Sequence, residues 1–350
     1  MEILDNLNVI KQRDPEDALG VVGAQFEQLT WEAVIENTAD YGDFVPANVV
    51  LGGMGGSALG GLIARDWLEL EIPFVVTRDY ELPNFVDEKS LVICVSVSGN
   101  TEETLATLTD AQKRGAKIVI IASGGKLLEI AEAQNIPFIR LEKISQPRYG
   151  VFMHLRAITK ILNQFGLAVE RYEELAAQQT AVKDFISGIT ANVVAEQNPA
   201  KKLAFECVGK TPVVFSSSKF ASVAYKWKIS FNENAKNVAF WNELPEFSHN
   251  EFIGWTSHPI EKPFAIIDLR SEFDNPRISL RFELTEKLLS GQRPAVKTVN
   301  LHGDNALCQM LCGVAFGDFV SIYLGLLNGV DPTPVKLVEK LKVELNQVSM

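Results

Sequence analysis

A chain of 350 residues is long enough for two domains of ordinary size, each with a full hydrophobic core. Hydrophobic residues make up 47% and charged residues 22% of the sequence, as is typical of a soluble globular protein. The net charge of −11 disfavours nucleic acid as a partner, because few Lys and Arg remain to form a basic face. No membrane association is expected either, because no apolar run is judged long enough to span a bilayer.

The N-terminus and the cysteines indicate a cytoplasmic protein. Residues Met1–Asp5 are acidic and amphipathic, unlike the basic and then apolar start of a signal peptide. The four cysteines, Cys94, Cys207, Cys308 and Cys312, lie in apolar contexts, and no His or Cys pair completes a metal site around them. We therefore expect buried thiols in a reducing compartment and no bound metal.

The first half of the chain alternates strands and helices. After two helices within residues 1–40, short β-branched runs predict buried strands, each followed by a helical pattern. The predicted strands are Asn48–Leu51, Pro73–Val76, Leu91–Val95, Lys117–Ile121 and Phe138–Leu141. This alternation predicts an α/β domain, placed at residues 41–170, with a parallel sheet flanked by helices.

The strand at Leu91–Val95 ends in a turn that is rich in hydroxyl groups and opens directly into a helix. Ser96, Ser98 and Thr101 supply three side-chain hydroxyls, and the helical pattern begins at Glu102. Free backbone N–H groups and the positive end of the helix dipole collect at such a position. The turn therefore predicts a cradle for a phosphate dianion, and the alternative is an ordinary Asn or Thr cap.

A glycine-rich turn follows the first predicted strand. Gly53–Ala58 matches the pattern G-x-G-x-x-A, and Asp79 stands about twenty residues beyond it. This pattern is the fingerprint of an NAD-dependent dehydrogenase. Two turns that converge on one place suit a small sugar or phosphate better than a long pyrophosphate, but both interpretations stay open at this point.

The second half repeats the first half in outline, after a helical connection over residues 171–200. Its predicted strands are Pro212–Phe215, Phe264–Leu269 and Val296–Leu301. The order and spacing of these units indicate two copies of one α/β domain, the second at residues 201–350 and ending in an amphipathic helix. We expect the substrate site at their interface, with phosphate held by the first copy.

Three polar residues outside these turns are candidates for chemistry. Glu233 follows an aromatic helical pattern, so its carboxylate would be partly desolvated, which suits a general base. His249 follows an acidic loop broken by a proline and could act as acid or base. Arg148 could clamp an anion or stabilise a developing oxyanion. The alternatives are an ion pair of Glu233 with Lys228 or Lys236, loop packing of His249, and a surface ion pair of Arg148 with Glu142.

These stretches resemble the SIS (sugar isomerase) domain, and more closely the family of bifunctional phosphoglucose/phosphomannose isomerases. The resemblance spans nearly the whole chain and implies two flavodoxin-like SIS subdomains in a homodimer. The matching stretches are Gly52–Ser57, Ser96–Thr101, Pro147–Arg148, Asn232–Lys236, Trp241–Pro245, Ser248–Asn250, Gly317–Phe319 and Asp331–Val335. The first two are shared by many sugar-phosphate binders, whereas Asn232–Lys236, the His-Asn pair and Asp331–Val335 are more specific.

The resemblance also implies a role for each matched residue. The substrate phosphate would be held by Gly55, Gly56, Ser57, Ser96, Ser98 and Thr101. Glu233 would move a proton between C2 and C1 through a cis-enediol(ate), and Arg148 would stabilise the charge of that intermediate. His249 would assist ring opening, either in its own subunit or across the dimer interface.

Two further assignments come from the C-terminal stretch. A lysine of the last helix takes part in ring opening in the family, and Lys342 is the best match, with Lys340 as its rival. Thr333 would lie in the roomy part of the site that accepts mannose geometry. Lys336 departs from the family, which more often has a neutral residue or proline there.

Aldose–ketose isomerisation needs a base, an oxyanion stabiliser, a ring-opening acid and a phosphate anchor, and needs no metal or redox cofactor. We therefore predict a metal-independent enzyme, without cofactor, that interconverts glucose 6-phosphate, and also mannose 6-phosphate, with fructose 6-phosphate. The alternatives are a non-catalytic SIS sensor that binds sugar phosphates and an NAD-dependent dehydrogenase.

Overall fold

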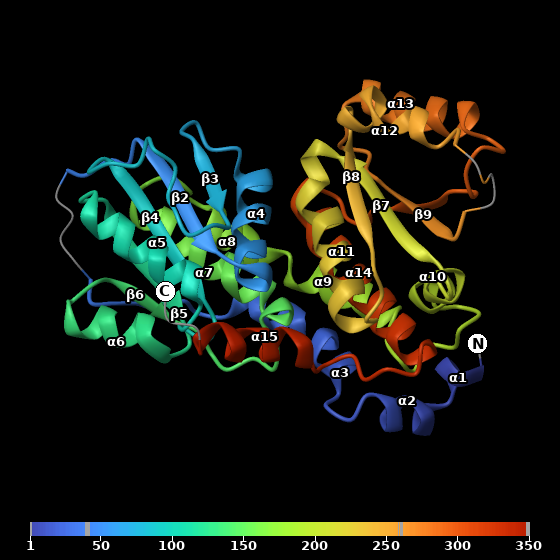
Figure 1. Cartoon of the computed structure of the whole chain (residues 1–350), viewed down its shortest axis with the longest axis horizontal. Coiled ribbons are helices and arrows are strands. Elements are labelled where there is room, and N and C mark those ends of the chain that lie inside the picture. Colours follow the sequence, from blue (N-terminus) through green and yellow to red (C-terminus); the bar gives the residue numbers. More distant parts are fainter. Residues whose placement is uncertain (1, 39–42, 258, 260–261, 348–350) are drawn as a thin grey trace.

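The computed structural model describes residues 2–38, 43–257, 259 and 262–347. These residues form two β-sheets with helices on both sides of each sheet and a shared helical layer between them (Figure 1). The predicted α/β class, with two sheets that are parallel in their central strands, is confirmed. The predicted domain limits stay a prediction.

The first sheet has six strands, and its centre is parallel. In spatial order the strands are β1 (Ile35–Glu36), β6 (Phe138–Arg140), β5 (Lys117–Ala122), β4 (Ser90–Ser96), β2 (Asn48–Gly53) and β3 (Phe74–Thr77). Only the short edge strand β1, in a region where helices alone were expected, runs antiparallel to its neighbour β6. The remaining five strands have the doubly wound, flavodoxin-like order 2-1-3-4-5, counted along the chain.

The second sheet is a shorter version of the first, with all of its strands parallel. In spatial order the strands are β10 (Lys297–Asn300), β9 (Phe264–Arg270), β7 (Thr211–Ser217) and β8 (Phe240–Leu244). Counted from β7, this is the order 4-3-1-2, which is the order of β5, β4, β2 and β3 in the first sheet. The repeat predicted from the sequence is therefore present in the topology.

The helices fall into three groups along the chain. The N-terminal group is α1 (Glu2–Asp5), α2 (Leu7–Arg13), α3 (Ala18–Gly23) and the 3-10 helix η1 (Gln25–Thr30). Those of the first half are α4 (Gly55–Leu68), α5 (Glu102–Lys113), α6 (Gly125–Ala133), η2 (Pro147–Tyr149), α7 (Val151–Gln164), α8 (Arg171–Ala177) and α9 (Gln179–Ser187). Those of the second half are α10 (Pro199–Glu206), η3 (Ser218–Phe220), α11 (Ala221–Asn234), η4 (Glu246–His249), α12 (Glu251–Gly254), α13 (Pro276–Leu288), α14 (Ala306–Leu327) and α15 (Lys336–Asn346).

The two halves share one hydrophobic core. Successive residues of a strand face opposite sides of a sheet, so one face of each sheet contributes to the shared core and the other face to an outer core. In β4, Ile93 faces a central core that also contains residues of α4, α7, α11 and α14, whereas Val92 faces a separate core under α5 and α6. In the second sheet Ile267 joins the central core and Ile266 joins an outer core with Phe282 of α13. The shared core fixes the loops of one half against those of the other.

Helix α14 shows that one prediction from the sequence is wrong, namely that no apolar run is long enough to span a bilayer. It has 22 residues and a hydropathy of 1.8, so by length and composition it could cross a membrane. In the folded protein, however, 94% of its apolar stretch is buried. Its glycines let Trp227 of α11 approach closely: the indole Nε1 donates to the carbonyl oxygen of Gly313 at 2.7 Å, and a Cβ on Gly317 would lie 2.5 Å from the same ring. The helix forms the centre of the core.

Helix α15 differs from all these elements because residues 336–345 are exposed along its whole length. Leu337 is 83% exposed and Leu341 is 60% exposed. In Figure 1 the helix (red) extends from the second half toward the half that contains the first sheet. Its place is therefore not fixed by a hydrophobic contact within the described chain.

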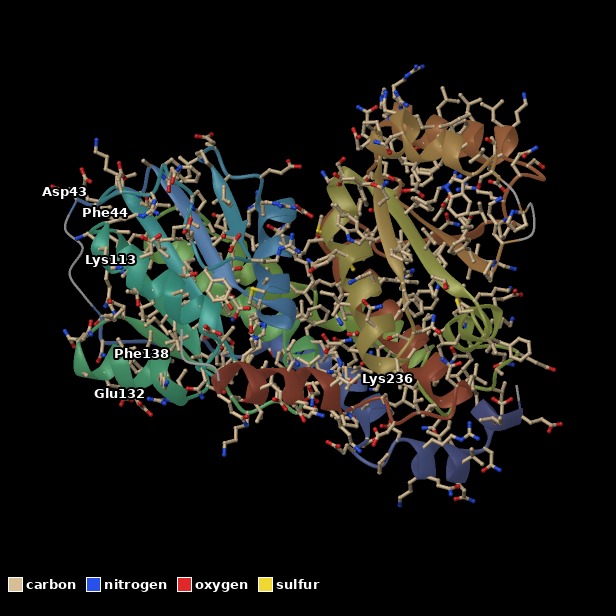
Figure 2. All side chains as sticks on the ribbon, in the orientation of Figure 1. Asp43, Phe44, Lys113, Glu132, Phe138 and Lys236 are labelled. Carbon is tan, nitrogen blue, oxygen red and sulfur yellow. The ribbon has the colours of Figure 1, made fainter. Side chains whose placement is uncertain are left out.

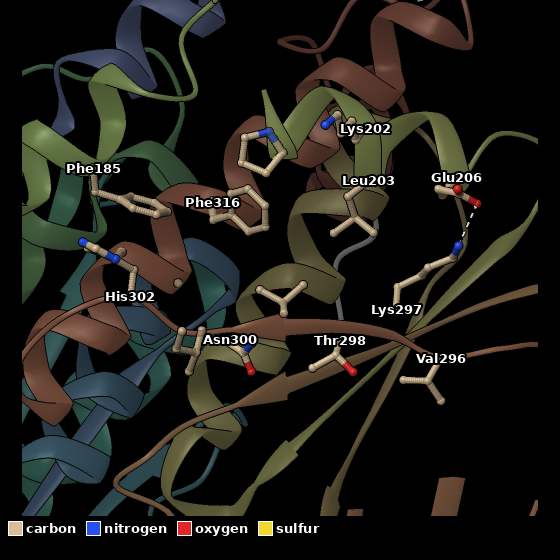
Figure 3. A pocket seen from close by; sticks show the side chains of 15 residues that line it. Phe185, Lys202, Leu203, Glu206, Val296, Lys297, Thr298, Asn300, His302 and Phe316 are labelled. Carbon is tan, nitrogen blue, oxygen red and sulfur yellow. Dashed lines mark ion pairs between the residues drawn. The ribbon is translucent and has the colours of Figure 1, made fainter. Parts of the chain in front are cut away.

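A cleft of about 540 Å³ lies at the open edge of the second sheet, between β10, α10 and α14 (Figure 3). Phe316 and Leu203 lie in its wall, and Lys297 pairs with Glu206 across one end at 3.1 Å. At the other end the ring of His302 stacks on the ring of Phe185. None of the predicted catalytic or substrate-binding residues lines this cleft, so it is separate from the candidate site.

Candidate active site

The predicted phosphate cradle forms where β2 and β4 end side by side. The strands that follow them, β3 and β5, lie on opposite sides, so a crevice opens at the carboxyl ends of β2 and β4. Ser96 Oγ lies 2.8 Å from Thr101 Oγ1 and 3.5 Å from Ser98 Oγ. Ser57, in the first turn of α4, accepts a hydrogen bond on Oγ from the N–H of Val97 at 3.4 Å. The four predicted hydroxyl groups are thus brought to one edge of the sheet.

The loops after β4 and β5 support each other beneath this cradle. Gly99 has φ of +68°, and a Cβ on it would lie only 1.8 Å from the carbonyl oxygen of Gly124, so only glycine fits. The side chain of Asn100 accepts a hydrogen bond on Oδ1 from the N–H of Lys126 at 3.0 Å. The backbone N–H groups at the start of α5 are therefore held in a fixed position.

Gly56 places Arg148 directly beside the cradle. A Cβ on Gly56 would lie 2.6 Å from the backbone nitrogen of Arg148 and 2.7 Å from the carbonyl carbon of Pro147. Helix η2, which follows β6, therefore packs on the first turn of α4 without any side chain between them. The absence of a side chain at residue 56 is what allows this contact.

Arg148 meets Glu233, which comes from the second half of the chain. The guanidinium Nη1 donates to Glu233 Oε2 at 2.8 Å, with the arginine side chain 0% exposed and the glutamate side chain 30% exposed. The alternative surface pair of Arg148 with Glu142 is therefore wrong, and neither Lys228 nor Lys236 is the ion-pair partner of Glu233 among the described residues. Glu233 lies near the end of α11, which packs against α4 and carries it to the cradle.

Lys236, which is labelled in Figure 2, contacts the same region. Its ammonium donates to the carbonyl oxygens of Glu233 and of Pro332, the latter at 3.0 Å. Burial, followed by the charge of Arg148, lowers the pKa of Lys236 to about 8. The lysine joins the end of α11 to the segment that leads into α15.

Thr333 lies behind Arg148 and is 1% exposed. Its carbonyl oxygen accepts a hydrogen bond from Arg148 Nη2 at 2.8 Å. Its buried Oγ1 has no hydrogen-bond partner among the described residues. The structure thus brings Arg148, Glu233 and Thr333 together, next to the predicted phosphate cradle.

Two predicted residues, His249 and Lys342, are not part of this cluster. Ser218, just before α11, donates to the carbonyl oxygen of Leu244 at 3.1 Å, and η4 with His249 follows that strand end. Glu233 lies near the other end of α11, whose 14 residues span about 20 Å. His249 is exposed, and Lys342 lies on the exposed helix α15.

In the second half of the chain, a carboxylate of the protein occupies the corresponding helix start. Asp66 of α4 accepts a hydrogen bond on Oδ2 from the N–H of Ser222, in the first turn of α11, at 3.0 Å. Burial raises the pKa of Asp66, and the contacts with Arg65 and Ser222 oppose that shift. A helix start attracts anions, and here the anion belongs to the protein itself.

The sequence did not identify Asn234 and Tyr149, although the asparagines on either side of Glu233 were a visible signal. Asn234 is 0% exposed, and its Oδ1 accepts hydrogen bonds from Arg148 Nε at 2.6 Å and from the Tyr149 hydroxyl at 2.9 Å. Burial also raises the pKa of Tyr149, so its hydroxyl stays a donor. Nor did the sequence reveal the buried ion pair of Lys226 with Asp318 between α11 and α14.

No group of three or more His, Cys, Asp or Glu side chains in the described part of the chain is placed to hold a metal ion. All four cysteines are buried free thiols, as expected. Metal independence itself stays a prediction.

Two family models and several known proteins indicate one family, and a D-glucosamine-6-phosphate 4-epimerase of Sulfolobus acidocaldarius is 34% identical over 65% of this chain and 70% of that relative. A family model described as the bacterial phospho-glucose isomerase C-terminal SIS domain matches residues 196–345, and the SIS domain model matches residues 46–135. A bifunctional phosphoglucose/phosphomannose isomerase of Aquifex aeolicus is 34% identical, over 95% of this chain and 99% of that relative. One of Caldicellulosiruptor bescii is 36% identical, over 86% of this chain and 90% of that relative.

A solved structure shows the same fold. The crystal structure of a glucose-6-phosphate isomerase like protein from Thermus thermophilus matches with a TM-score of 0.65 and 19% identity. The match covers 97% of this chain and 98% of that chain. At this identity the likeness shows the arrangement of the two sheets and their helices, and no more.

Proposed function

Because the chain belongs to the family of bifunctional phosphoglucose/phosphomannose isomerases, we propose that it is a phosphohexose isomerase that interconverts glucose 6-phosphate and mannose 6-phosphate with fructose 6-phosphate. One observation carries the proposal: the ion pair of Arg148 with Glu233 lies beside the hydroxyl-rich cradle, at the junction of the two halves. An anion site, a carboxylate and a fixed cation are the groups that a proton transfer next to a carbonyl needs.

The cradle would hold the phosphate through Gly55, Gly56, Ser57, Ser96, Ser98 and Thr101. Two helix starts, those of α4 and α5, point their free N–H groups at this place. Phosphate binding would fix the sugar so that C1 and C2 lie near Glu233. Such anchoring by a part of the substrate that does not react is how binding energy aligns the reacting atoms.

Glu233 would act as the base. Arg148 holds Oε2, whereas Oε1 accepts no hydrogen bond from the described residues, and this oxygen would remove the proton from C2 of the aldose. The same carboxyl group would return the proton to C1, and the hydroxyl proton of O2 would pass to O1, which yields the ketose. Arg148 would stabilise the negative charge on the enediolate oxygen during this transfer.

Ring opening requires an acid, and the predicted acid, His249, is not part of the cluster. Because His249 lies near the opposite end of α11 from Glu233, we propose that it acts in the site of a second copy, in a homodimer. Lys342 would reach the site only if α15 packed against the site. Lys340, on the same helix, remains the alternative.

The test is isomerisation of glucose 6-phosphate and of mannose 6-phosphate to fructose 6-phosphate by the purified chain, with EDTA present throughout. Turnover of both substrates supports the proposal and its metal independence. Binding of the sugar phosphates without turnover of either would identify a sensor. An increase in melting temperature with NAD, but not with sugar phosphates, would favour the dehydrogenase.

A further inference from the structure

Every N–H group of the Arg148 side chain is already used in the protein without substrate. An arginine has five such groups and no acceptor. Its side chain is 0% exposed, so water does not compete for them. Nε donates to Asn234 Oδ1 at 2.6 Å. The other acceptors are Gln146 Oε1 (3.1 Å) and Glu233 Oε2 (2.8 Å) for Nη1, and the carbonyl oxygens of Pro332 (2.9 Å) and Thr333 (2.8 Å) with the Tyr149 hydroxyl (3.4 Å) for Nη2.

An oxyanion can therefore bind this guanidinium only if one existing contact opens. The acceptors at Nε and Nη2 belong to buried residues: Asn234 is 0% exposed and Thr333 is 1% exposed. The acceptors at Nη1, from Gln146 and Glu233, are the partly exposed ones. Nη1 is thus the end of the guanidinium whose acceptors are partly exposed, and we expect its contact with Glu233 to be the one that a substrate reaches.

Asn234 is itself held in one orientation. Its Nδ2 donates to Ser321 Oγ at 2.8 Å, and Ser321 donates in turn to the carbonyl oxygen of Asp318 at 2.9 Å. This leaves Oδ1 directed at Arg148. A Cβ on Gly325 would lie 2.7 Å from the carbonyl oxygen of Asn234, so α14 packs tightly against the end of α11. If the amide group flipped, it would lose its contacts with Arg148 and Tyr149 on one side and with Ser321 on the other.

On the basis of the proposed function, we infer that Asn234 is a positioning residue for the reaction: it fixes the guanidinium plane so that Nη1 alone can pass from Glu233 to the developing oxyanion. The exchange does two things at once. It frees Oε2 of the base, and it provides an N–H group where negative charge appears. Asn234 follows Glu233 on the same helix. The base and the residue that positions Arg148 therefore keep a fixed position relative to each other.

The experiment compares Asn234→Ala with Asn234→Asp in the full-length protein. Alanine removes the acceptor at Nε and leaves the contacts of Nη2 as the only buried contacts that hold the guanidinium plane, so we expect kcat to fall at least about tenfold. KM should change less than about threefold, because the phosphate cradle is untouched. Aspartate keeps an oxygen at the position of Oδ1, and kcat should stay within about fivefold of the wild type.

Asn198→Ala is the matched control. Asn198 is also 0% exposed and makes four hydrogen bonds, with Ala200, Lys201, Ile189 and Thr190, but it lies at the start of α10, away from the cluster. Its replacement should lower the melting temperature and leave kcat unchanged. Should Asn234→Ala not fold, Asn234→Ser takes its place, because serine is too short to reach Nε.

The inference is overturned if Asn234→Ala, or its serine substitute, keeps kcat within about threefold of the wild type. It is also overturned if Asn234→Asp loses as much activity as Asn234→Ala, because the acceptor oxygen would then not matter. Failure of the proposed function would look different, since the wild type itself would turn over neither sugar phosphate.

Discussion

At the residue scale, the candidate site combines buried polar side chains with polar side chains that are partly or fully exposed. The side chain of Arg148 is 0% exposed, whereas that of its partner Glu233 is 30% exposed. A buried cation with fixed partners keeps its position when the exposed partner moves, and little reorganisation is then needed during the reaction. The phosphate cradle follows the same rule, with Ser96 and Ser57 buried and Ser98 exposed.

Thr101→Val tests the cradle without changing its shape. Thr101 precedes α5, but its side chain makes no capping hydrogen bond, so valine should leave the helix intact. Its Oγ1 lies 2.8 Å from Ser96 Oγ. Loss of this hydroxyl removes a proposed phosphate ligand, which would act equally in the ground and transition states. We expect KM for fructose 6-phosphate to rise about tenfold with kcat within about threefold. Steady-state kinetics would contradict the assignment if only kcat fell.

His154 should make the stability of the protein depend on pH. Burial lowers its pKa to about 4, from an ordinary value of 6.5. Between these values the unfolded state binds more protons, so the free energy of unfolding decreases as the pH falls from about 6.5 to 4. In His154→Leu that part of the decrease, about 2–3 kcal/mol, should be absent. Urea unfolding at pH 7 and pH 4 measures it, and an unchanged difference between the two would refute the prediction.

The sequence could single out Arg148 and Glu233 because each is a charged residue in an unusual setting. It could not predict that they touch, since they are 85 positions apart and meet only through packing of the two halves. Asn234 was missed for a related reason: a buried amide has no signature until the groups around it are known.

At the element scale, helices α11 and α14 are joined by a buried ion pair of Lys226 with Asp318, both 0% exposed. Ser230 also donates to Asp318, at 2.8 Å. Burial lowers the pKa of Lys226, and the carboxylate opposes that shift. Such a pair depends on both partners, because either charge alone would be left in an apolar environment.

Asp318→Leu should therefore lower the free energy of unfolding by about 3–5 kcal/mol. Adding Lys226→Met removes the stranded cation, and most of this loss should be recovered in the double variant. Chemical denaturation of the two single variants and the double variant provides the measurement. If the loss in free energy of unfolding of the double variant equals the sum of the losses of the two single variants, the two charges do not act as a pair.

Most strands could be predicted, because a parallel sheet buried on both faces requires continuous apolar runs. Strand β8 was missed because Phe240–Leu244 is polar in its middle and only its last residue is buried. Strand β1 was missed because two residues at a sheet edge carry almost no pattern.

At the scale of the whole molecule, one chain does not bring all of the predicted catalytic residues together. The proposed base and the proposed phosphate cradle meet at the junction of the two halves, but the exposed His249 lies near the opposite end of α11. The repeat could be predicted from the order of strands and turns. The sequence also placed the phosphate in the first copy, but it could not show that Asp66, a residue of the first copy, occupies the start of α11 in the second.

Mixed dimers test whether His249 acts across an interface. Glu233→Gln and His249→Ala subunits should each be nearly inactive alone. If His249 serves the partner's site, refolding equal amounts together gives mixed dimers with one intact site, and about a quarter of the wild-type activity should return. If no activity returns while mixed dimers form, His249 acts in its own subunit.

The most direct test of the account is exchange of solvent deuterium into fructose 6-phosphate, followed by NMR, for the wild type and Glu233→Gln. A carboxylate that carries a proton between C2 and C1 exposes it to solvent, so the wild type should incorporate deuterium at C1. In Glu233→Gln the exchange should fall at least about a hundredfold, while fructose 6-phosphate still raises the melting temperature. Exchange at an unchanged rate in the variant would show that Glu233 is not the base.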